Sequence, residues 1–327
     1  MGEPAKTTVP MRILSGVQPS GRPHIGNYFG AMRQNIELSH RSDAFIFIAN
    51  YHAMTTVRDR KLLAEYTDGL ARDYLALGLD PSRCAFYRQS DVPEVCELSW
   101  ILTTVTPMGL LERCVSYKDK VDKGIPADHG LFAYPVLMAA DILIVKSTTV
   151  PVGADQKQHV EVARDIAIKF NNTHGNVFPL PEERILPEVA AVPGVDGQKM
   201  SKSYGNTIEP FEDEKALRRK VMSIKTDSKG VAEVKDPETC NLFALFKLFA
   251  KSEERDALAA RYRSGGLGYG DVKKRLADLI LEHFAEARKR RAALTAEEVE
   301  AALRVGAEKA RKVARETMVE VRKAVGV

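Results

Sequence analysis

The chain has 327 residues, of which 44% are hydrophobic and 28% are charged, and its formal net charge is +4. This length is enough to bury a large core and to form two domains, and no apolar run approaches the ~20 residues of a membrane span. The composition excludes a membrane-spanning protein, and the mildly positive charge permits a polyanionic partner without requiring one. The first residues lack the apolar stretch of a secretory signal, so we expect a cytoplasmic protein with no membrane partner.

The cysteines indicate neither a disulfide framework nor a metal site. None of them belongs to a C-x-x-C pair or has a histidine at zinc-ligand spacing, and they stand at positions 84, 96, 114 and 240. We therefore predict that protein side chains hold no metal, and we expect these cysteines to behave as small apolar residues.

A turn rich in glycine and proline, residues 19–27, follows the first predicted strand, residues 12–17. The next helix is predicted to begin near Gly26 and Asn27, where the apolar residues take a helical spacing. The N-terminus of a helix offers unpaired N–H groups to an anion, and His24 adds a donor whose protonation can follow that of a phosphate. The pattern predicts a phosphate site; the alternative is an ordinary strand-to-helix turn with a solvent-facing histidine.

Strands and helices alternate in the following stretch. A continuous apolar run at 44–49 predicts a strand covered on both faces, residues 59–78 have the pattern of a helix, and 84–88 form another short strand candidate. This order predicts an α/β fold, a doubly wound parallel sheet of Rossmann-like type that binds a nucleotide at the carboxyl ends of its strands.

Residues 94–128 are predicted to be mostly helical and interrupt the alternation as a short insertion. In the next helix, residues 131–143, Tyr134, Met138 and Asp141 share one face and can line one pocket. Asp141 lies among apolar residues, where an unpaired carboxylate is costly. It therefore needs a donor, which is either a ligand or another side chain of the core.

A short strand over 150–153 is predicted to end at a turn. Gly153, Asp155 and Gln156 follow at its carboxyl end and are expected to face the site. The helix that begins at Asp155 carries an apolar stripe, and His159 is interpreted as an ordinary polar residue of that helix, outside the site.

A basic loop, here called the lysine loop, spans residues 199–203. Lys199 and Lys202 stand three residues apart, with Ser201 and Ser203 beside them and two glycines shortly before. Such a loop can close on a triphosphate. The alternative is a solvated basic turn, which is common for an isolated Lys/Ser-rich pentamer.

Beyond the lysine loop the strand signal disappears. Helical patterns separated by turn residues occupy residues 212–224, 241–251, 253–263, 272–291 and 297–324. We expect a Rossmann-like domain over 1–205, a helical domain over 206–298, and a C-terminal helix over 299–327 that packs near the domain junction. The basic runs at 218–220 and 288–291 suit either phosphate contacts or a solvated face.

Taken together, these motifs resemble those of class I aminoacyl-tRNA synthetases. The sequence His24-Ile25-Gly26-Asn27 matches the HIGH-type signature, and residues 199–203 match the KMSKS signature without a change. Three further stretches, 18–21, 134–143 and 152–159, are similar to those of tryptophanyl-tRNA synthetases. The similarity covers nearly the whole chain and implies that L-tryptophan is activated with ATP and transferred to tRNA(Trp).

The resemblance also implies a role for each matched position. The implied catalytic residues are His24, Asn27, Lys120, Lys199 and Lys202. The implied ATP contacts are Gln18, Ser20, Gly26, Asn27, Gly153, Asp155, Lys199, Met200, Ser201 and Lys202. The implied tryptophan contacts are Tyr134, Met138, Asp141, Gln156 and His52, with Asp141 pairing with the indole N–H. Mg²⁺ would accompany ATP, and the short insertion would help to form a homodimer, which would bind tRNA(Trp).

Two departures and three alternatives accompany this interpretation. Leu14 replaces an aromatic residue often found beside the indole, and residues 204–207 are not the commonest continuation of the lysine loop. A tyrosyl-tRNA synthetase shares the fold but usually has Gln where Met138 stands. A small nucleotidylyltransferase would not need the long helical domain, and an RNA-binding paralogue would not need intact phosphate motifs.

Overall fold

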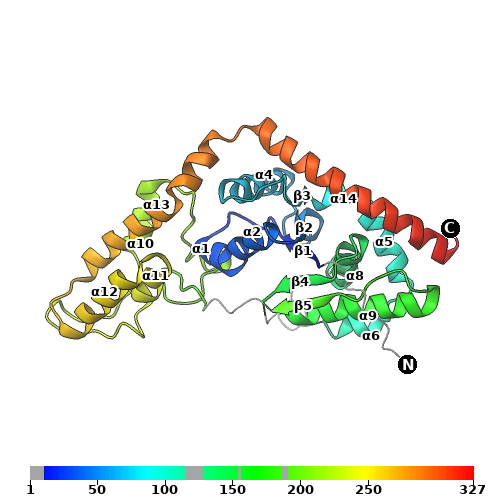
Figure 1. The fold of residues 1–327 in the computed structure, drawn as a ribbon. Helices are drawn as coiled ribbons and strands as arrows, with labels where there is room; N and C mark the ends of the chain where they lie inside the picture. Colours follow the sequence, from blue (N-terminus) through cyan, green and yellow to red (C-terminus); the bar gives the residue numbers. More distant parts are fainter. Residues whose placement is uncertain (1–10, 115–127, 154–155, 186–190) are drawn as a thin grey trace, which may run out of the picture. The chain divides into compact units, whose positions relative to one another are not determined.

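The computed structural model describes residues 11–114, 128–153, 156–185 and 191–327 (Figure 1). The chain divides into two compact units. The first unit contains residues 1–20, 34–188 and 295–327, and the second contains residues 21–33 and 189–294. The chain thus leaves and re-enters the first unit twice.

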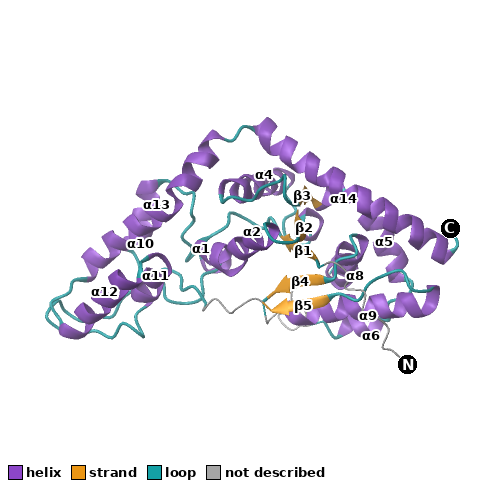
Figure 2. Cartoon of the chain, in the orientation of Figure 1, coloured by secondary structure: helices purple, strands orange, loops and turns teal. Residues whose placement is uncertain are grey.

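A five-stranded parallel sheet organises the first unit (Figure 2). The strand order β3-β2-β1-β4-β5 places the first strand at the centre, so the sequence order reverses between β1 and β4. In such sheets, ligands bind outside the carboxyl ends of the strands at the point of reversal. The strands are β1 (Arg12–Val17), β2 (Asp43–Ile48), β3 (Ala85–Arg88), β4 (Thr149–Val152) and β5 (Glu182–Ile185). The predicted doubly wound parallel sheet is therefore confirmed.

Strand β5 is the strand that the sequence pattern did not predict. It pairs in parallel with β4, from Thr149 opposite Glu182 to Val152 opposite Ile185. Three of its four residues are exposed. An exposed edge strand has no need of the continuous apolar run that reveals a strand covered on both faces.

Helices of the first unit bury the apolar residues of the sheet. The core joins side chains of the strands to those of α5, α8, α9 and α14. Asp59 begins α4 by accepting hydrogen bonds from the backbone N–H groups of Lys61 and Leu62, as N-cap residues do. The helical elements are α2 (Arg33–Ser39), α3 (Asn50–Ala53), α4 (Arg60–Ala76), the short turn η2 (Gln89–Asp91), α5 (Glu94–Thr103), α6 (Met108–Glu112), α8 (His129–Ile144), α9 (Lys157–His174) and α14 (Ala296–Val325).

The C-terminal helix α14 packs against β3, although about two hundred residues separate them in sequence. At their crossing a Cβ atom on Gly306 would lie 1.8 Å from the carbonyl oxygen of Phe86. Ion pairs hold the helix to α5: Arg311 lies 3.1 Å from Glu94, and Arg322 lies 2.6 Å from Glu97. The last helix is therefore part of the first unit.

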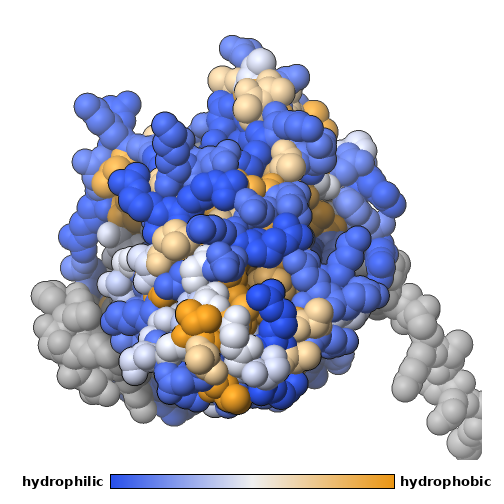
Figure 3. Space-filling view, turned by 90° about the vertical axis from the view of Figure 1, so that its left-hand side faces the viewer, coloured by the Kyte–Doolittle hydropathy of each residue, from blue (hydrophilic) through white to orange (hydrophobic). Residues whose placement is uncertain are grey.

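The second unit is helical in its described residues, as predicted for the chain beyond the lysine loop. An aromatic cluster joins its elements: Tyr28 packs edge-on against His283 and Phe284, and Phe29 packs edge-on against Phe249. Phe29 and Phe284 are its buried members. The helical elements are α1 (Ile25–Asn27), the π-helical turn η1 (Tyr28–Met32), the short turn η4 (Lys202–Tyr204), α10 (Glu214–Met222), α11 (Asn241–Phe249), α12 (Ser252–Ser264) and α13 (Tyr269–Ala293). Seen from the side at which α12 lies in Figure 1, most of the visible surface is hydrophilic (Figure 3).

None of the helices in the described ranges combines the length and the apolar character that crossing a membrane requires.

Candidate active site

The turn that was predicted to hold a phosphate is closed by two reciprocal hydrogen bonds. Nδ1 of His24 accepts from the backbone N–H of Asn27 at 3.2 Å, and the side-chain oxygen of Asn27 accepts from the backbone N–H of His24 at 3.1 Å. This capping box begins α1. Because Nδ1 is an acceptor, the proton of a neutral His24 ring resides on Nε2, which becomes a hydrogen-bond donor.

The electrostatic environment keeps that ring neutral. Burial, and next the positive charge of Lys202, lower the pKa of His24 to about 4. The sequence suggested a histidine whose protonation follows that of a phosphate. In the structure the ring instead serves as a neutral donor near pH 7, because it is only 6% exposed and lies near an ammonium group.

Gly26 is required by close packing at this turn. A Cβ atom at this position would lie 2.9 Å from Nδ1 of His24 and 3.6 Å from Cβ of Met200. Any larger residue would therefore displace the ring of His24. The same contact shows that the lysine loop and the turn lie against each other within the second unit.

The lysine loop reaches this turn through Lys202. Its ammonium group donates to the carbonyl oxygen of Gly21 at 3.0 Å, and partial desolvation lowers its pKa. Met200 is buried, and its backbone N–H donates to Val192 at 2.8 Å. Lys199 is exposed. The two signature motifs, far apart in sequence, thus lie side by side as their pairing predicted.

Asn206 holds the lysine loop in place, a role that no sequence pattern predicted. Its side-chain oxygen accepts from the backbone N–H of Ser201 at 2.8 Å. Its side-chain nitrogen donates to Asp196 at 2.8 Å and to the carbonyl oxygen of Lys199 at 3.2 Å. The stretch that departs from the commonest family pattern therefore contains a buried residue that bonds to both sides of the loop.

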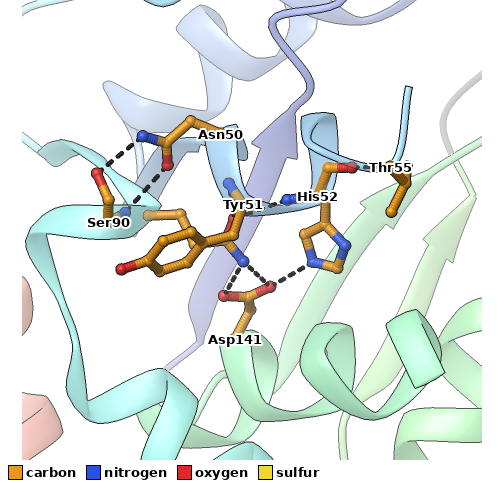
Figure 4. Close-up of polar contacts among 7 residues, drawn as sticks. Asn50, Tyr51, His52, Thr55, Ser90 and Asp141 are labelled. Carbon is orange, nitrogen blue, oxygen red and sulfur yellow. Dashed lines mark hydrogen bonds and ion pairs between the residues drawn. The ribbon is translucent and has the colours of Figure 1, made fainter. Parts of the chain in front are cut away.

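In the first unit, Asp141 lies at the centre of a buried hydrogen-bond network (Figure 4). Nε2 of His52 lies 2.9 Å from one carboxylate oxygen, and the amide nitrogen of Gln89 lies 2.9 Å from both. Burial raises the pKa of Asp141. The hydrogen bond from His52, the electrostatic effect of His52 and the hydrogen bonding of Gln89 each act to lower it. The donor that Asp141 was expected to need is thus supplied within the protein.

A cavity of about 750 Å³ lies beside this network, bordered by α3, α5 and α8. Of the residues expected to bind tryptophan, His52 and Tyr134 line it, together with Tyr51, Cys96 and Leu137. Asp141 is buried beneath it at 3% exposure. Met138 and Gln156 are not among the residues that line it.

Other expected ATP contacts lie at the carboxyl edge of the sheet in the first unit. Gln18 and Ser20 follow β1, where the backbone N–H of Ser20 donates to the carbonyl oxygen of Gln18 at 2.9 Å. Gly153 follows the neighbouring strand β4. Lys120 and Asp155 fall outside the described residues.

Comparison with known proteins identifies the family. Residues 6–285 match the tRNA synthetases of class I for tryptophan and tyrosine. A tryptophan–tRNA ligase of Rhodopirellula baltica is 51% identical over 319 residues, which are 97% of this chain and 100% of that protein. The crystal structure of tryptophanyl-tRNA synthetase from Campylobacter jejuni complexed with ADP and tryptophan has a TM-score of 0.92 at 51% identity, covering 97% of this chain and 100% of that one. The tryptophanyl-tRNA synthetase of Mycoplasma pneumoniae, at 27% identity, has a TM-score of 0.80, covering 98% of each chain.

The chain belongs to the class I tRNA synthetases for tryptophan and tyrosine. Within this family its activity is that of a tryptophan–tRNA ligase, an ATP-dependent enzyme. The expected family and fold are confirmed, and the roles of individual residues stay predictions.

The synthetase has a second series of hydrogen-bonded side chains, and its central residue, His159, was not predicted to belong to the site. The hydroxyl group of Tyr134 lies 2.9 Å from Nε2 of His159, and Nδ1 of His159 lies 2.7 Å from the side-chain oxygen of Gln156. Because an amide oxygen only accepts, Nδ1 carries a proton, and in a neutral ring Nε2 then accepts from Tyr134. His159 therefore connects two residues that were expected to hold the amino group of tryptophan.

Two of the missed residues carried a weak signal in the sequence. Gln89 directly follows a predicted strand, the place where a parallel sheet collects ligand-binding side chains. His159 lies three residues after Gln156, so both can share one helix face. Neither signal specifies a partner, because Gln89 bonds to a residue 52 positions away and His159 to one 25 positions away.

Proposed function

We propose that the HIGH-type turn and the lysine loop of the second unit bind the phosphates of ATP, and that the residues around Asp141 in the first unit bind tryptophan. The carboxylate of tryptophan attacks the α-phosphorus of ATP, which forms the adenylate and releases pyrophosphate. The terminal ribose hydroxyl of tRNA(Trp) then attacks the carbonyl carbon of the adenylate, and AMP departs. Neither step requires a nucleophilic side chain, so the protein acts by positioning and by electrostatic stabilisation.

The observation that carries the phosphate assignment is the adjacency of a neutral histidine donor and an ammonium group. His24 presents its Nε2 proton, and Lys202 lies close enough to lower the pKa of His24. Negative charge grows on the pyrophosphate as it departs, so the interactions of Lys202 and Lys199 with it strengthen in the transition state. His24 and Asn27 hold the triphosphate in place.

Mg²⁺ enters this proposal as part of the substrate. The described residues include no cluster of three or more His, Cys, Asp or Glu side chains that could hold a metal ion. Mg²⁺ commonly binds through substrate phosphates and retains several of its water molecules. We therefore assign the ion to MgATP, where it neutralises part of the phosphate charge.

The tryptophan assignment rests on the unused acceptor capacity of Asp141. A carboxylate offers about four acceptor positions, and the hydrogen bonds from His52 and Gln89 use three of them. The indole N–H would use the fourth. Met138 would pack on the ring, while Tyr134 and Gln156 would hold the amino group.

ATP–pyrophosphate exchange with each amino acid in turn tests the proposal. We expect exchange with tryptophan and little with phenylalanine, because phenylalanine leaves the buried acceptor unpaired. Exchange with tyrosine that equals or exceeds exchange with tryptophan would contradict the assignment.

A homodimer in the cytoplasm, binding tRNA(Trp), completes the proposal. Its support is the apolar surface of α5 and α6, where Trp100 is 71% and Met108 is 62% exposed. Sedimentation velocity should show a dimer that Trp100→Glu dissociates and that Val319→Glu, a change at an exposed apolar residue on α14, leaves intact. A wild-type monomer with full activity would contradict it.

A further inference from the structure

The orientation of the Gln89 side chain is determined by its surroundings. Its side-chain oxygen accepts from the backbone N–H groups of Tyr51 at 3.0 Å and His52 at 3.3 Å. Two backbone N–H groups can only donate, so the amide oxygen must face them and the NH₂ group must face Asp141. Gln89 is 0% exposed, so bulk solvent does not reach these positions.

The carboxylate of Asp141 depends on this NH₂ group to remain an acceptor. The titratable groups that face it are His52 from α3, Tyr87 from β3 and Cys96 from α5. Burial raises the pKa of both Tyr87 and Cys96, so both stay neutral near pH 7 and place no negative charge beside the carboxylate. Burial favours the protonated form of Asp141, and the hydrogen bonds from His52 and Gln89 favour the ionised form.

The geometry also disfavours a proton on Asp141 itself. The NH₂ group of Gln89 lies 2.9 Å from both carboxylate oxygens. If Asp141 were protonated, its own O–H would compete with the NH₂ group of Gln89 for the space beside the two oxygens, and two donors would then face each other. We propose that Gln89 is a positioning residue that keeps Asp141 an acceptor and thereby makes the site prefer a ring that donates an N–H. This inference rests on the proposed placement of the indole at Asp141.

A purely structural role for Gln89 would be to connect the turn η2 to α3. The neighbouring pair makes the same connection without touching Asp141: the side-chain nitrogen of Asn50 donates to Ser90 at 2.8 Å, and the backbone N–H of Ser90 donates to Asn50 at 3.1 Å (Figure 4). Ser90→Ala is therefore a matched control, since it weakens the connection and leaves the carboxylate network in place.

The test measures kcat/KM for activation by ATP–pyrophosphate exchange from pH 6 to 8.5, as the ratio of variant to wild type. In Gln89→Met, Asp141 loses two hydrogen bonds and holds its proton to higher pH, so the ratio should rise with pH. In Gln89→Glu, the new carboxyl group and that of Asp141 share one proton at low pH. As pH rises this proton is lost and the two negative charges repel each other, so the ratio should fall. Ser90→Ala should give a ratio that is flat with pH.

A second measurement compares tryptophan with its benzothiophene analogue, in which sulfur replaces the N–H group. The preference of the wild type for tryptophan should fall at least tenfold in Gln89→Met and stay unchanged in Ser90→Ala. Equal losses for both substrates, with flat ratios in both Gln89 variants, would overturn the inference in favour of a structural role. Gln89→Glu preserves side-chain size, so its slope decides the matter if Gln89→Met does not fold.

Failure of the underlying site assignment would look different. If the indole does not bind at Asp141, the wild-type enzyme itself will show no preference for tryptophan over the benzothiophene analogue. In that case the proposed site fails before any Gln89 variant is measured.

Discussion

Lys202 and Lys199 are expected to act on the reaction more than on substrate affinity. Replacement of either by Ala should remove a contact that strengthens as pyrophosphate departs, which costs ~2–4 kcal/mol in the activation barrier. Pyrophosphate exchange should fall accordingly, while the calorimetric affinity for tryptophan stays close to that of the wild type. A collapse of tryptophan affinity with an unchanged activation rate would contradict the role given to the lysine loop.

His24 should make stability depend on pH. Its pKa is lowered from 6.5 to about 4, so the unfolded chain binds more protons between these values. The contribution is therefore present above about pH 6.5 and is lost as pH falls toward 4, by an amount on the order of 3 kcal/mol.

Urea unfolding at several pH values measures this dependence. His24→Asn keeps a side chain able to cap α1 but cannot titrate, so its unfolding free energy should fall less steeply with acid than that of the wild type. Identical slopes for both proteins would show that His24 is not held neutral by its surroundings.

At the scale of secondary-structure elements, Gly306 fixes how closely α14 approaches β3. A Cβ atom there would lie 1.8 Å from a backbone carbonyl, and backbone cannot move aside as a side chain can. We expect Gly306→Ala to lower the free energy of unfolding by several kcal/mol, as overpacking does at the upper end of its range, ~3 kcal/mol or more.

Gly69 provides the control, because it lies within α4 and a Cβ atom there would meet nothing within 4 Å. Gly69→Ala should stabilise the protein by ~1 kcal/mol, the usual difference in helix propensity. Thermal unfolding measures both, and similar effects of the two substitutions would contradict the close approach of α14.

Helices and strands with a buried face could be predicted, because burial leaves a pattern of apolar residues in their own sequence. Individual side-chain contacts could not be predicted from such patterns. Strand β2 is a continuous apolar run with five of its six residues buried, and β1, β3 and β4 each contain at least two consecutive buried residues. Strand β5 is mostly exposed at the edge of the sheet and was not predicted. The paired phosphate motifs identified His24 and Lys202 together. Gln89 was missed because its partners, Tyr51 and Asp141, are brought to it by the order of strands and helices. Asn206 was missed although its partners lie within ten residues of it, because side-chain hydrogen bonds inside a loop leave no periodic pattern in the sequence.

For the whole molecule, tRNA binding should depend on the exposed basic residues of the second unit. The structure shows which residues of the two basic runs, 218–220 and 288–291, bond within the unit and which are exposed enough to contact the phosphates of tRNA. Arg288 donates to the carbonyl oxygens of Pro210 and Glu212 at 2.6 and 2.8 Å, and Arg218 lies 2.7 Å from Asp278. These two guanidinium groups bond within the unit itself, so the other exposed basic residues of the two runs are the better candidates for phosphate contacts.

Charge reversal at the exposed residues Arg219, Lys289 and Arg290 should weaken tRNA binding. If each contacts one phosphate, the slope of log affinity against log salt should decrease by about 2–3. Binding titrations at several salt concentrations measure this slope. Arg288→Glu should instead destabilise the unit, and an unaltered salt slope in the triple variant would place the tRNA elsewhere.

The return of residues 295–327 to the first unit affects how the protein is made. Domains generally fold as units while synthesis proceeds from the N-terminus, but here the helix that covers β3 follows that strand by about two hundred residues. A ribosome translating this message holds an incomplete sheet, with apolar strand surface uncovered, until residues 296–325 have been synthesised. Loss of even part of α14 would therefore leave the first unit, and not merely a tail, unfinished and exposed to chaperones and proteases.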